Sequence, residues 1–357
     1  MTEIEQLQNL ISSITPTDQS ARDRAIVRQA QLTKPAGSLG RLEEISVWLA
    51  GVYGTQKPVI AGKAVIVCAG DHGVTLEGVS AYPSEVTPAM VQNFLAGGAA
   101  VSAIARVVNA RVLVLDVGVN ADLPGHADLI RAKVRRGTGN IAREPAMTEL
   151  ETARAILAGA NAAKRAIDDG ANLLAAGDMG IGNTTPSAAL TAWLTGKDAI
   201  EVTGRGTGID VTTLSRKVSI IELVLDNARE AGFEPDDALG ALEVMGGLEI
   251  AAMVGVMLQG ASARIPVIVD GFIAGAAALV ACGISSAVQE YLSASHVSQE
   301  PGHRIQLTHL KLEPLFDYGL RLGEGTGALL AMPVLEAAAR TLSEMATFAE
   351  ANVPTKS

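Results

Sequence analysis

The fold is decided by a short apolar run that ends in glycine and aspartate, Ala64-Val65-Ile66-Val67-Cys68-Ala69-Gly70-Asp71. Runs of the same kind recur at 112–118, 172–178 and 266–271. Continuous apolar runs without polar alternation are typical of parallel strands covered on both faces. Helical stretches are predicted between these runs, at 88–107, 148–169, 212–231 and 240–260. This alternation predicts an α/β fold with a mostly parallel sheet flanked by helices.

The two ends of the chain differ in character from the middle. Residues 1–60 look helical, with one helix predicted around residues 4–11 and another over 42–51. A long Ala- and Leu-rich helix is predicted over 328–350. We therefore expect residues 1–60 and 328–357 to form a smaller helical domain, with the large α/β domain, 61–327, inserted between them.

Composition excludes several classes of protein. The 357 residues are 48% hydrophobic and 18% charged, so a large core is expected. The net charge of −10 argues against a nucleic-acid-binding surface and against attraction to an anionic membrane. The apolar stretch 266–284 contains Asp270 and Gly271, and it is better explained by a buried strand and helix than by a membrane span. With two cysteines and no N-terminal signal segment in this sequence, a cytoplasmic protein is expected.

Two glycine-rich loops could bind a phosphate. The first is Gly177-Asp178-Met179-Gly180-Ile181-Gly182-Asn183-Thr184-Thr185, and the second is Gly204-Arg205-Gly206-Thr207-Gly208. Backbone N–H groups of a glycine loop that leads into a helix form an anion site, although a plain tight turn explains one such loop equally well. Neither loop has P-loop spacing, and the dinucleotide-like stretch 137–142 follows a charged run and not a buried strand.

A third motif, Leu322-Gly323-Glu324-Gly325-Thr326-Gly327, holds a carboxylate between glycines just before the C-terminal helix. Glu324 could contact a ligand closely, or it could simply interact with the helix dipole. His72, in Asp71-His72-Gly73, is more often a structural residue than a catalyst. The histidines and cysteines lack metal-ligand spacing, so no metal is expected. The residues alone therefore predict an α/β enzyme that acts on a small phosphorylated metabolite.

Taken together, the motifs resemble the nicotinate-nucleotide–dimethylbenzimidazole phosphoribosyltransferase family. The resemblance extends over nearly the whole chain, in the expected order. It is carried by Thr33-Lys34-Pro35-Ala36-Gly37-Ser38-Leu39-Gly40-Arg41-Leu42-Glu43, Ala69-Gly70-Asp71-His72-Gly73-Val74, Gly78-Val79-Ser80-Ala81-Tyr82-Pro83, residues 93–100 and 116–119, the two glycine loops, 269–272, Ser295-His296 with Glu300, and 321–327.

The resemblance implies a reaction, a fold and an assembly. The 5-phosphoribosyl group of nicotinate mononucleotide moves to 5,6-dimethylbenzimidazole, with inversion at C1′, and the products are α-ribazole 5′-phosphate and nicotinate. No cofactor is implied. The family fold is a large Rossmann-like domain with a small domain built from both chain ends, and the implied assembly is a homodimer.

The resemblance also implies roles for individual residues. Glu324 matches the family's general base, while Lys217 and Arg321 match active-site cations by position only. Asp178 stands where the family has a glutamate, so its carboxylate is one methylene shorter; either the loop shifts inward or Asp178 acts through water. The benzimidazole site is matched by Ser80, Tyr82 and Leu322. The nucleotide and phosphate site is matched by Gly180, Gly182, Asn183, Thr184, Gly206, Thr207, Gly208, Ser298 and Arg321.

Two alternative functions remain open at this stage. In a nucleotide N-glycosidase, water would replace the benzimidazole and Glu324 would activate it. A nucleotide-binding sensor would keep the loops without turnover. The preferred base is also left open, because related azoles and phenols differ only in how they fit a pocket.

Overall fold

The computed structural model describes residues 1–206 and 208–354. Its centre is one six-stranded sheet in the order β3-β2-β1-β4-β5-β6. All five strand pairs are parallel. The strands are β1 (Lys63–Gly70), β2 (Arg111–Gly118), β3 (Leu129–Arg131), β4 (Leu173–Met179), β5 (Val267–Val269) and β6 (Leu292–Ala294). This is the strand order of a doubly wound Rossmann sheet, so the predicted α/β class is confirmed.

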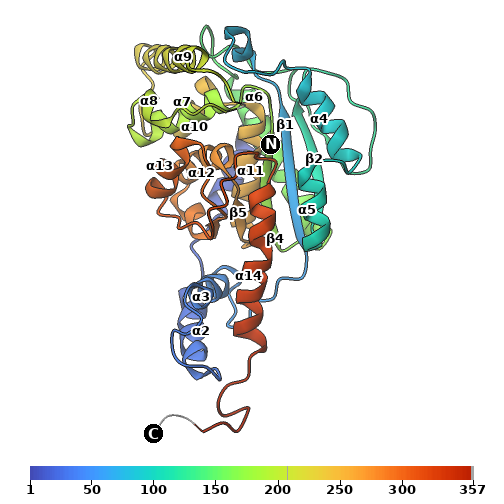
Figure 1. The fold of residues 1–357 in the computed structure, drawn as a ribbon, viewed down its shortest axis with the longest axis vertical. Coiled ribbons are helices and arrows are strands. Elements are labelled where there is room, and N and C mark those ends of the chain that lie inside the picture. The colour runs from blue at the N-terminus through green and yellow to red at the C-terminus, as the bar shows by residue number, and fades with distance from the viewer. Residues whose placement is uncertain (207, 355–357) are drawn as a thin grey trace.

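Helices cover both faces of the sheet (Figure 1). One face packs against α6 (Glu149–Asp168), α11 (Leu248–Ser262) and α12 (Phe272–Ile284), and α10 (Ala238–Met245) packs on α6 and α12. The other face packs against α4 (Val86–Leu95), α5 (Ala100–Val108) and the first turns of α14 (Thr326–Glu344). Successive side chains of β1 therefore enter two different cores. Ala64, Ile66 and Cys68 belong to the first core, and Val65, Val67 and Ala69 to the second. This double coverage explains why the strand sequence is continuously apolar.

The remaining helices either pack around α12 or belong to the N-terminal part of the chain. The first group is α7 (Thr184–Thr195), α8 (Ala199–Val202), α9 (Val211–Glu230) and α13 (Pro301–His309). The N-terminal helices are α1 (Glu3–Ser12), α2 (Gln19–Gln31) and α3 (Arg41–Tyr53). Short 3₁₀ turns lie at Gly73–Glu77 and Ser286–Tyr291.

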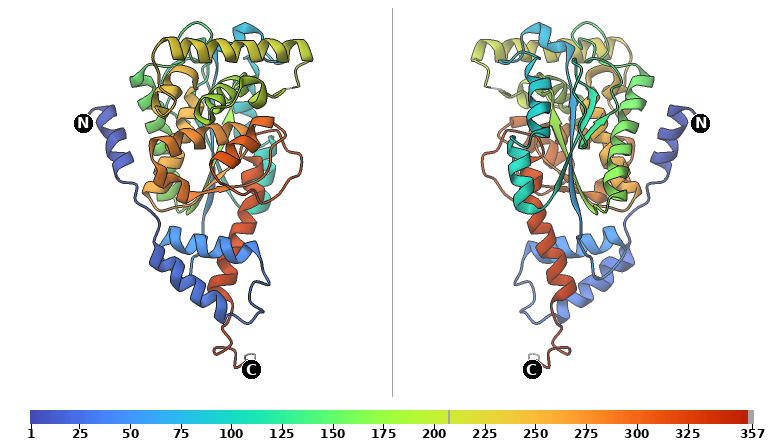
Figure 2. Two further views of the ribbon diagram at one scale, coloured as in Figure 1. Left: turned by 90° about the vertical axis from the view of Figure 1, so that its left-hand side faces the viewer. Right: turned by 90° about the vertical axis from the view of Figure 1, so that its right-hand side faces the viewer.

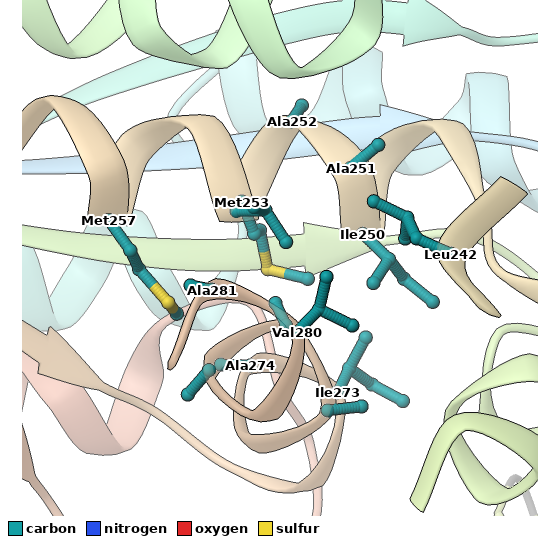
Figure 3. Close-up of a cluster of buried hydrophobic side chains, with 14 of the residues drawn as sticks. Leu242, Ile250, Ala251, Ala252, Met253, Met257, Ile273, Ala274, Val280 and Ala281 are labelled. Carbon is teal, nitrogen blue, oxygen red and sulfur yellow. The ribbon is translucent and has the colours of Figure 1, made fainter. Parts of the chain in front are cut away.

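Small side chains bring the buried helices close together. Side chains built at Gly159 of α6 and Gly255 of α11 would overlap backbone carbonyl oxygens of the opposite helix, those of Ala252 and Ile156. Between α11 and α12, the side chains of Met253 and Met257 lie next to small or branched residues (Figure 3). Full burial of a methionine side chain contributes about 1.5–3 kcal/mol to the stability of the fold. The sheet with this helical layer is a rigid platform for the loops at the strand ends.

Helices α2 and α3 and the C-terminal part of α14 lie together below the sheet. Figures 1 and 2 show α2, α3 and the C-terminal part of α14 as one group beneath the large layer. Within this group α2 packs on α3, and α14 packs on both. Helix α1 instead packs on α6 and α11, and its Leu7 belongs to the first core of the sheet. The division into 1–60 with 328–357 and 61–327 stays a prediction, and these contacts favour counting α1 with the large domain.

Three predicted helices have different bounds in the structure. The stretch 88–107 is two helices, α4 and α5, separated at residues 96–99, where Gly97 has a φ of +76°. The stretch 240–260 is also two helices, α10 and α11, separated by Gly246 and Gly247. The C-terminal helix ends at Glu344 instead of residue 350. In the first two cases paired glycines end a helix in spite of a continuous apolar pattern.

Among the described residues, one stretch, Val86–Val108, is long and apolar enough to cross a membrane by length and composition alone. It consists of α4 and α5, of 10 and 9 residues, and neither reaches the roughly 20 residues that a spanning helix needs. The stretch 266–284 forms β5 and α12, so the prediction of a strand followed by a helix is confirmed.

Candidate active site

The candidate site lies at the carboxyl ends of the strands, near the point where the strand order reverses between β1 and β4. Loops that follow β1, β4, β5 and β6 meet there, and the segment before α14 joins them. Two adjoining cavities open between these loops. We call them the nucleotide chamber and the base chamber, according to the roles proposed below.

The nucleotide chamber is the more polar of the two and measures about 310 Å³. Its lining contains two acidic residues, Asp178 and Glu300, and one arginine, Arg321. The full lining is Tyr82, Asp178, Asn183, Thr184, Gly206, Gly271, Phe272, Ile273, His296, Ser298, Glu300, Arg321, Leu322 and Gly323. The base chamber measures about 420 Å³ and is largely apolar. It is lined by Val79, Ser80, Tyr82, Val86, Met90, Asp178, Met179, Gly180, Ile181, Gly182, Asn183, Thr184, Leu322 and Glu324.

Asp178 lies at the junction of the two chambers, at the end of β4. Its Oδ2 accepts a hydrogen bond of 2.9 Å from Nδ2 of Asn183, the residue just before α7. Burial raises the pKa of Asp178 to about 8, with Asp270, Glu249 and Glu324 contributing, while the Asn183 hydrogen bond opposes the shift. The free protein therefore holds a mostly neutral acid at this junction at pH 7. Although the side chain of Asp178 is one methylene shorter than the glutamate expected from the family resemblance, it lines both chambers.

Glu324 lines the base chamber and is held in an unusual backbone conformation. Its φ is +62°, between two glycines with φ of +80° and +82°. The residue is buried, and Oε2 has no hydrogen-bond partner among the described residues. Burial raises the pKa of Glu324, although the N–H of Val101, at the start of α5, lowers it. A carboxylate with a spare buried oxygen and a raised pKa is suited to accept a proton.

Asp270, after β5, fixes the segment that carries Glu324. Its carboxylate accepts from the backbone N–H of Gly325 at 3.1 Å and from that of Ala328 at 2.8 Å. Burial raises the pKa of Asp270 to about 7, in spite of these hydrogen bonds. Asp270 thus caps α14 while Glu324 remains available to the chamber.

The second glycine loop forms one wall of the nucleotide chamber. The N–H of Gly206 donates to Oε1 of Glu300 at 2.9 Å, and Nη1 of Arg321 donates to the Gly206 carbonyl at 3.2 Å. Lys217 is buried behind this wall, where Nζ donates to Oγ1 of Thr184 at 2.7 Å. Burial lowers the pKa of Lys217 to about 8, although Glu300 raises it. Lys217 thus reaches the chamber through Thr184 and is not itself part of the lining.

His72 lies beneath the first glycine loop and forms a buried pair with Glu249. Nε2 of His72 is 2.6 Å from Oε1 of Glu249, and both side chains are buried. A side chain at Gly180 would come within 3.1 Å of both partners, so the loop rests directly on the pair. Burial lowers the pKa of His72, but Glu249, Asp71 and Asp178 outweigh it and raise the pKa overall. This geometry agrees with a structural role for His72.

Most of the predicted site residues line the two chambers, but Lys217 does not, and some residues line a different chamber from the one expected. Gly180 and Gly182, expected at the nucleotide, line the base chamber instead, and Asn183 and Thr184 line both. Tyr82 and Leu322, expected at the base, also line both chambers and are 54% and 56% exposed, at their mouth. Gly208 lines neither chamber. Thr207 lies outside the described residues. The roles of all these residues stay predictions.

Several lining residues were not predicted from the sequence as site residues. In the base chamber these are Val79, Val86, Met90, Met179 and Ile181, whose apolar pattern matches ordinary core positions. In the nucleotide chamber they are Gly271, Phe272, Ile273, His296, Glu300 and Gly323. The motif Ser295-His296 with Glu300 was the only signal for His296 and Glu300. Within the described residues, no cluster of three or more His, Cys, Asp or Glu could hold a metal ion.

Comparison with known proteins places the chain in a family. A family model described as phosphoribosyltransferase matches residues 14–353. Nicotinate-nucleotide–dimethylbenzimidazole phosphoribosyltransferase of Deinococcus radiodurans is 56% identical over 98% of this chain and 96% of its own length. The enzyme of the same name from Chloroflexus aurantiacus is 52% identical over 98% of this chain and 99% of its own.

Solved structures agree with this result. The crystal structure of the enzyme of that name from Thermus thermophilus is 49% identical and superimposes with a TM-score of 0.89, covering 95% of this chain and 100% of its own. A second crystal structure from the same organism gives a TM-score of 0.91 at 50% identity, with 94% and 100% covered. This chain belongs to the nicotinate-nucleotide–dimethylbenzimidazole phosphoribosyltransferase family.

Proposed function

We propose that this protein transfers the 5-phosphoribosyl group of nicotinate mononucleotide to 5,6-dimethylbenzimidazole. The single observation that carries the proposal is the pair of adjoining chambers that share Tyr82, Asp178, Asn183, Thr184 and Leu322. A polar chamber with Arg321 suits a nucleotide, and a largely apolar chamber suits a methylated aromatic base. Because the chambers adjoin, the base in one chamber can reach C1′ of the nucleotide in the other.

The proposed reaction proceeds at the junction of the chambers. A ring nitrogen of the benzimidazole attacks C1′ as the bond from C1′ to the nicotinate nitrogen breaks, and that electron pair stays on nicotinate. The nitrogen of the pyridinium ring is already a good leaving group, so it needs no proton. Attack from the opposite face inverts C1′ from β to α. The other ring N–H of the benzimidazole gives its proton to Glu324, which lines the base chamber.

In the proposed reaction Asp178 stabilises positive charge, and Lys217 orients a neighbouring hydroxyl. The nicotinate ring of the substrate is cationic, and a cation close to Asp178 favours ionisation of that carboxyl. Ionised Asp178 would then stabilise the positive charge that develops at C1′. Lys217 orients the Thr184 hydroxyl through its 2.7 Å hydrogen bond.

One assay tests the proposed function. The purified protein is incubated with nicotinate mononucleotide, with and without dimethylbenzimidazole, and the products are separated by chromatography. We expect nicotinate release that depends on the base and is matched by α-ribazole 5′-phosphate. Equal release without the base would indicate a nucleotide N-glycosidase, and no release would indicate a nucleotide-binding sensor.

Tyr82 provides a test of the base chamber. Its side chain lines both chambers at their mouth. Because it covers the flat aromatic base, Tyr82→Ala is expected to raise the KM for dimethylbenzimidazole about tenfold and to change the KM for nicotinate mononucleotide less. Val107→Ala is the control, since Val107 is 84% exposed and lines neither chamber. A raised KM for the nucleotide, with that for the base unchanged, would contradict this assignment.

Assembly and location are proposed from two further observations. A largely apolar groove of about 490 Å³ lies between α2 and α3, with Ile26 and Trp48 in its lining. It supports the homodimer that the family resemblance implies. A monomer in sedimentation velocity at micromolar concentration would refute the homodimer.

The cysteines bear on the location of the protein. Cys68 and Cys282 are both free, which supports a reducing, cytoplasmic compartment.

A further inference from the structure

His296 is held in a fixed position in the wall of the nucleotide chamber. It follows β6 directly, and a parallel bridge pairs it with Phe316. Its ring stacks on Phe316, with ring centroids 6.0 Å apart and an interplanar angle of 14°. The residue is only 3% exposed, yet it lines the chamber. Its orientation is therefore set by the protein before any ligand binds.

The hydrogen bonds of Ser295 determine which ring nitrogen of His296 carries the proton. Oγ of Ser295 lies 2.9 Å from the carbonyl oxygens of both Val269 and Asp270, and 2.8 Å from Nδ1 of His296. Carbonyl oxygens only accept, so the single hydroxyl proton of Ser295 points toward them. Oγ then accepts from Nδ1–H of His296, and this assigns the proton to Nδ1.

Nε2 of His296 is consequently a hydrogen-bond acceptor. It has no hydrogen-bond partner among the described residues. A Cβ built on Gly271, another residue of the chamber lining, would lie 3.7 Å from Nε2, so this edge of the ring faces the chamber lining. Burial lowers the pKa of His296 to about 4, although Asp317 raises it, so the ring is neutral at pH 7.

A neutral acceptor requires a donor on the ligand. The phosphate and carboxylate of nicotinate mononucleotide are acceptors near neutral pH, and its pyridinium ring has no N–H. The donors that remain are the ribose hydroxyls. The benzimidazole does carry an N–H, but His296 does not line the base chamber.

We propose that Nε2 of His296 accepts a hydrogen bond from a ribose hydroxyl of the nucleotide and so selects a ribosyl over a deoxyribosyl substrate. This inference rests on the proposed function and adds a specificity residue to it. His296 binds and orients the sugar whose C1′ reacts, and it takes no part in the proton transfer assigned to Glu324.

The test crosses substrate analogues with variants of His296. Nicotinate mononucleotide and its 2′-deoxy and 3′-deoxy analogues are compared by kcat/KM at saturating dimethylbenzimidazole. The wild-type protein is expected to use at least one deoxy analogue about 10–100-fold less well, since a buried acceptor is then left without its donor. His296→Phe keeps a ring stacked on Phe316 but removes the acceptor. It should lower kcat/KM for the natural nucleotide by a similar factor and abolish the preference over that analogue.

His296→Gln is the conservative variant, because its amide oxygen lies near the position of Nε2 and should restore part of the preference. The KM for dimethylbenzimidazole should not change in either variant, and thermal unfolding checks that both are folded. A wild-type protein that uses all three nucleotides equally would overturn the inference without any variant, and so would full discrimination retained in His296→Phe. Both outcomes would leave the proposed transferase activity standing, whereas a wild-type protein with no transfer would overturn both.

Discussion

Glu324→Gln is expected to lower turnover by about 100–10,000-fold, the usual contribution of a general base. Glutamine keeps the shape of the side chain but cannot take the proton from the benzimidazole N–H. Nucleotide binding should change little, since Glu324 lines the base chamber and not the nucleotide chamber. Glutamine also leaves the left-handed backbone at this position unchanged, with its φ of +62°. Turnover and the melting temperature are measured on one preparation.

The pH dependence of turnover sharpens this test. Because burial raises the pKa of Glu324, wild-type turnover should rise with pH as this carboxyl loses its proton. The part of the rise that Glu324 causes should be absent in Glu324→Gln, whereas any part caused by ionisation of Asp178 should remain. A residue that only interacts with the α14 dipole would behave differently: its loss would cost about 0.3–1 kcal/mol of stability and leave the rate nearly unchanged. Near-normal turnover with a lowered melting temperature would make Asp178 the next candidate base.

Asp178→Asn is expected to stabilise the protein, and to do so more at alkaline pH. The pKa of Asp178 is about 8 in the folded protein, against an ordinary aspartate value of 3.8, so the unfolded chain loses this proton first. The contribution of Asp178 to stability therefore falls as the pH rises from about 4 to about 8, by about 1.4 kcal/mol per unit. Asparagine has no such proton, and its amide oxygen can still accept from Nδ2 of Asn183.

Chemical denaturation at pH 5.5 and pH 9 measures this difference. The gain in the free energy of unfolding should be about 3 kcal/mol larger at pH 9 than at pH 5.5. Asp23→Asn is the control, since Asp23 is an exposed aspartate and its replacement should change stability little at either pH. An equal gain at both pH values would mean that Asp178 is ionised throughout this range in the folded protein.

The sequence was sufficient for the parts of this protein that depend on local pattern. Apolar runs within β1, β2 and β4, which are seven or eight residues long, indicated strands buried on both faces. Helices such as α6 and α9, of 20 residues each, were found within one or two residues of their ends. Glycine and aspartate at the strand ends marked the edge where the chambers lie. These features can be predicted from the sequence because each results from one segment and its own periodicity.

Short or atypical elements were missed because neighbouring segments stabilise them. β3 and β6 are three residues long, too short for a recognisable period, and pairing with β2 and β5 holds them in the sheet. Helix α2 is rich in polar and charged residues and buries few of its side chains, against α3 and α14.

The arrangement of the site was decided by the tertiary structure alone. Strand order brings together Asp178, Asp270, His296 and Glu324, which are far apart in the sequence. Their charge states follow from that proximity and from burial, since Asp270, Glu249 and Glu324 all raise the pKa of Asp178. Motifs in the sequence identified a carboxylate and a glycine loop. That Gly180 lines the base chamber, and that Nε2 of His296 is an acceptor, depends on contacts between segments that no local pattern connects, such as those of Ser295 with the carbonyl oxygens of Val269 and Asp270.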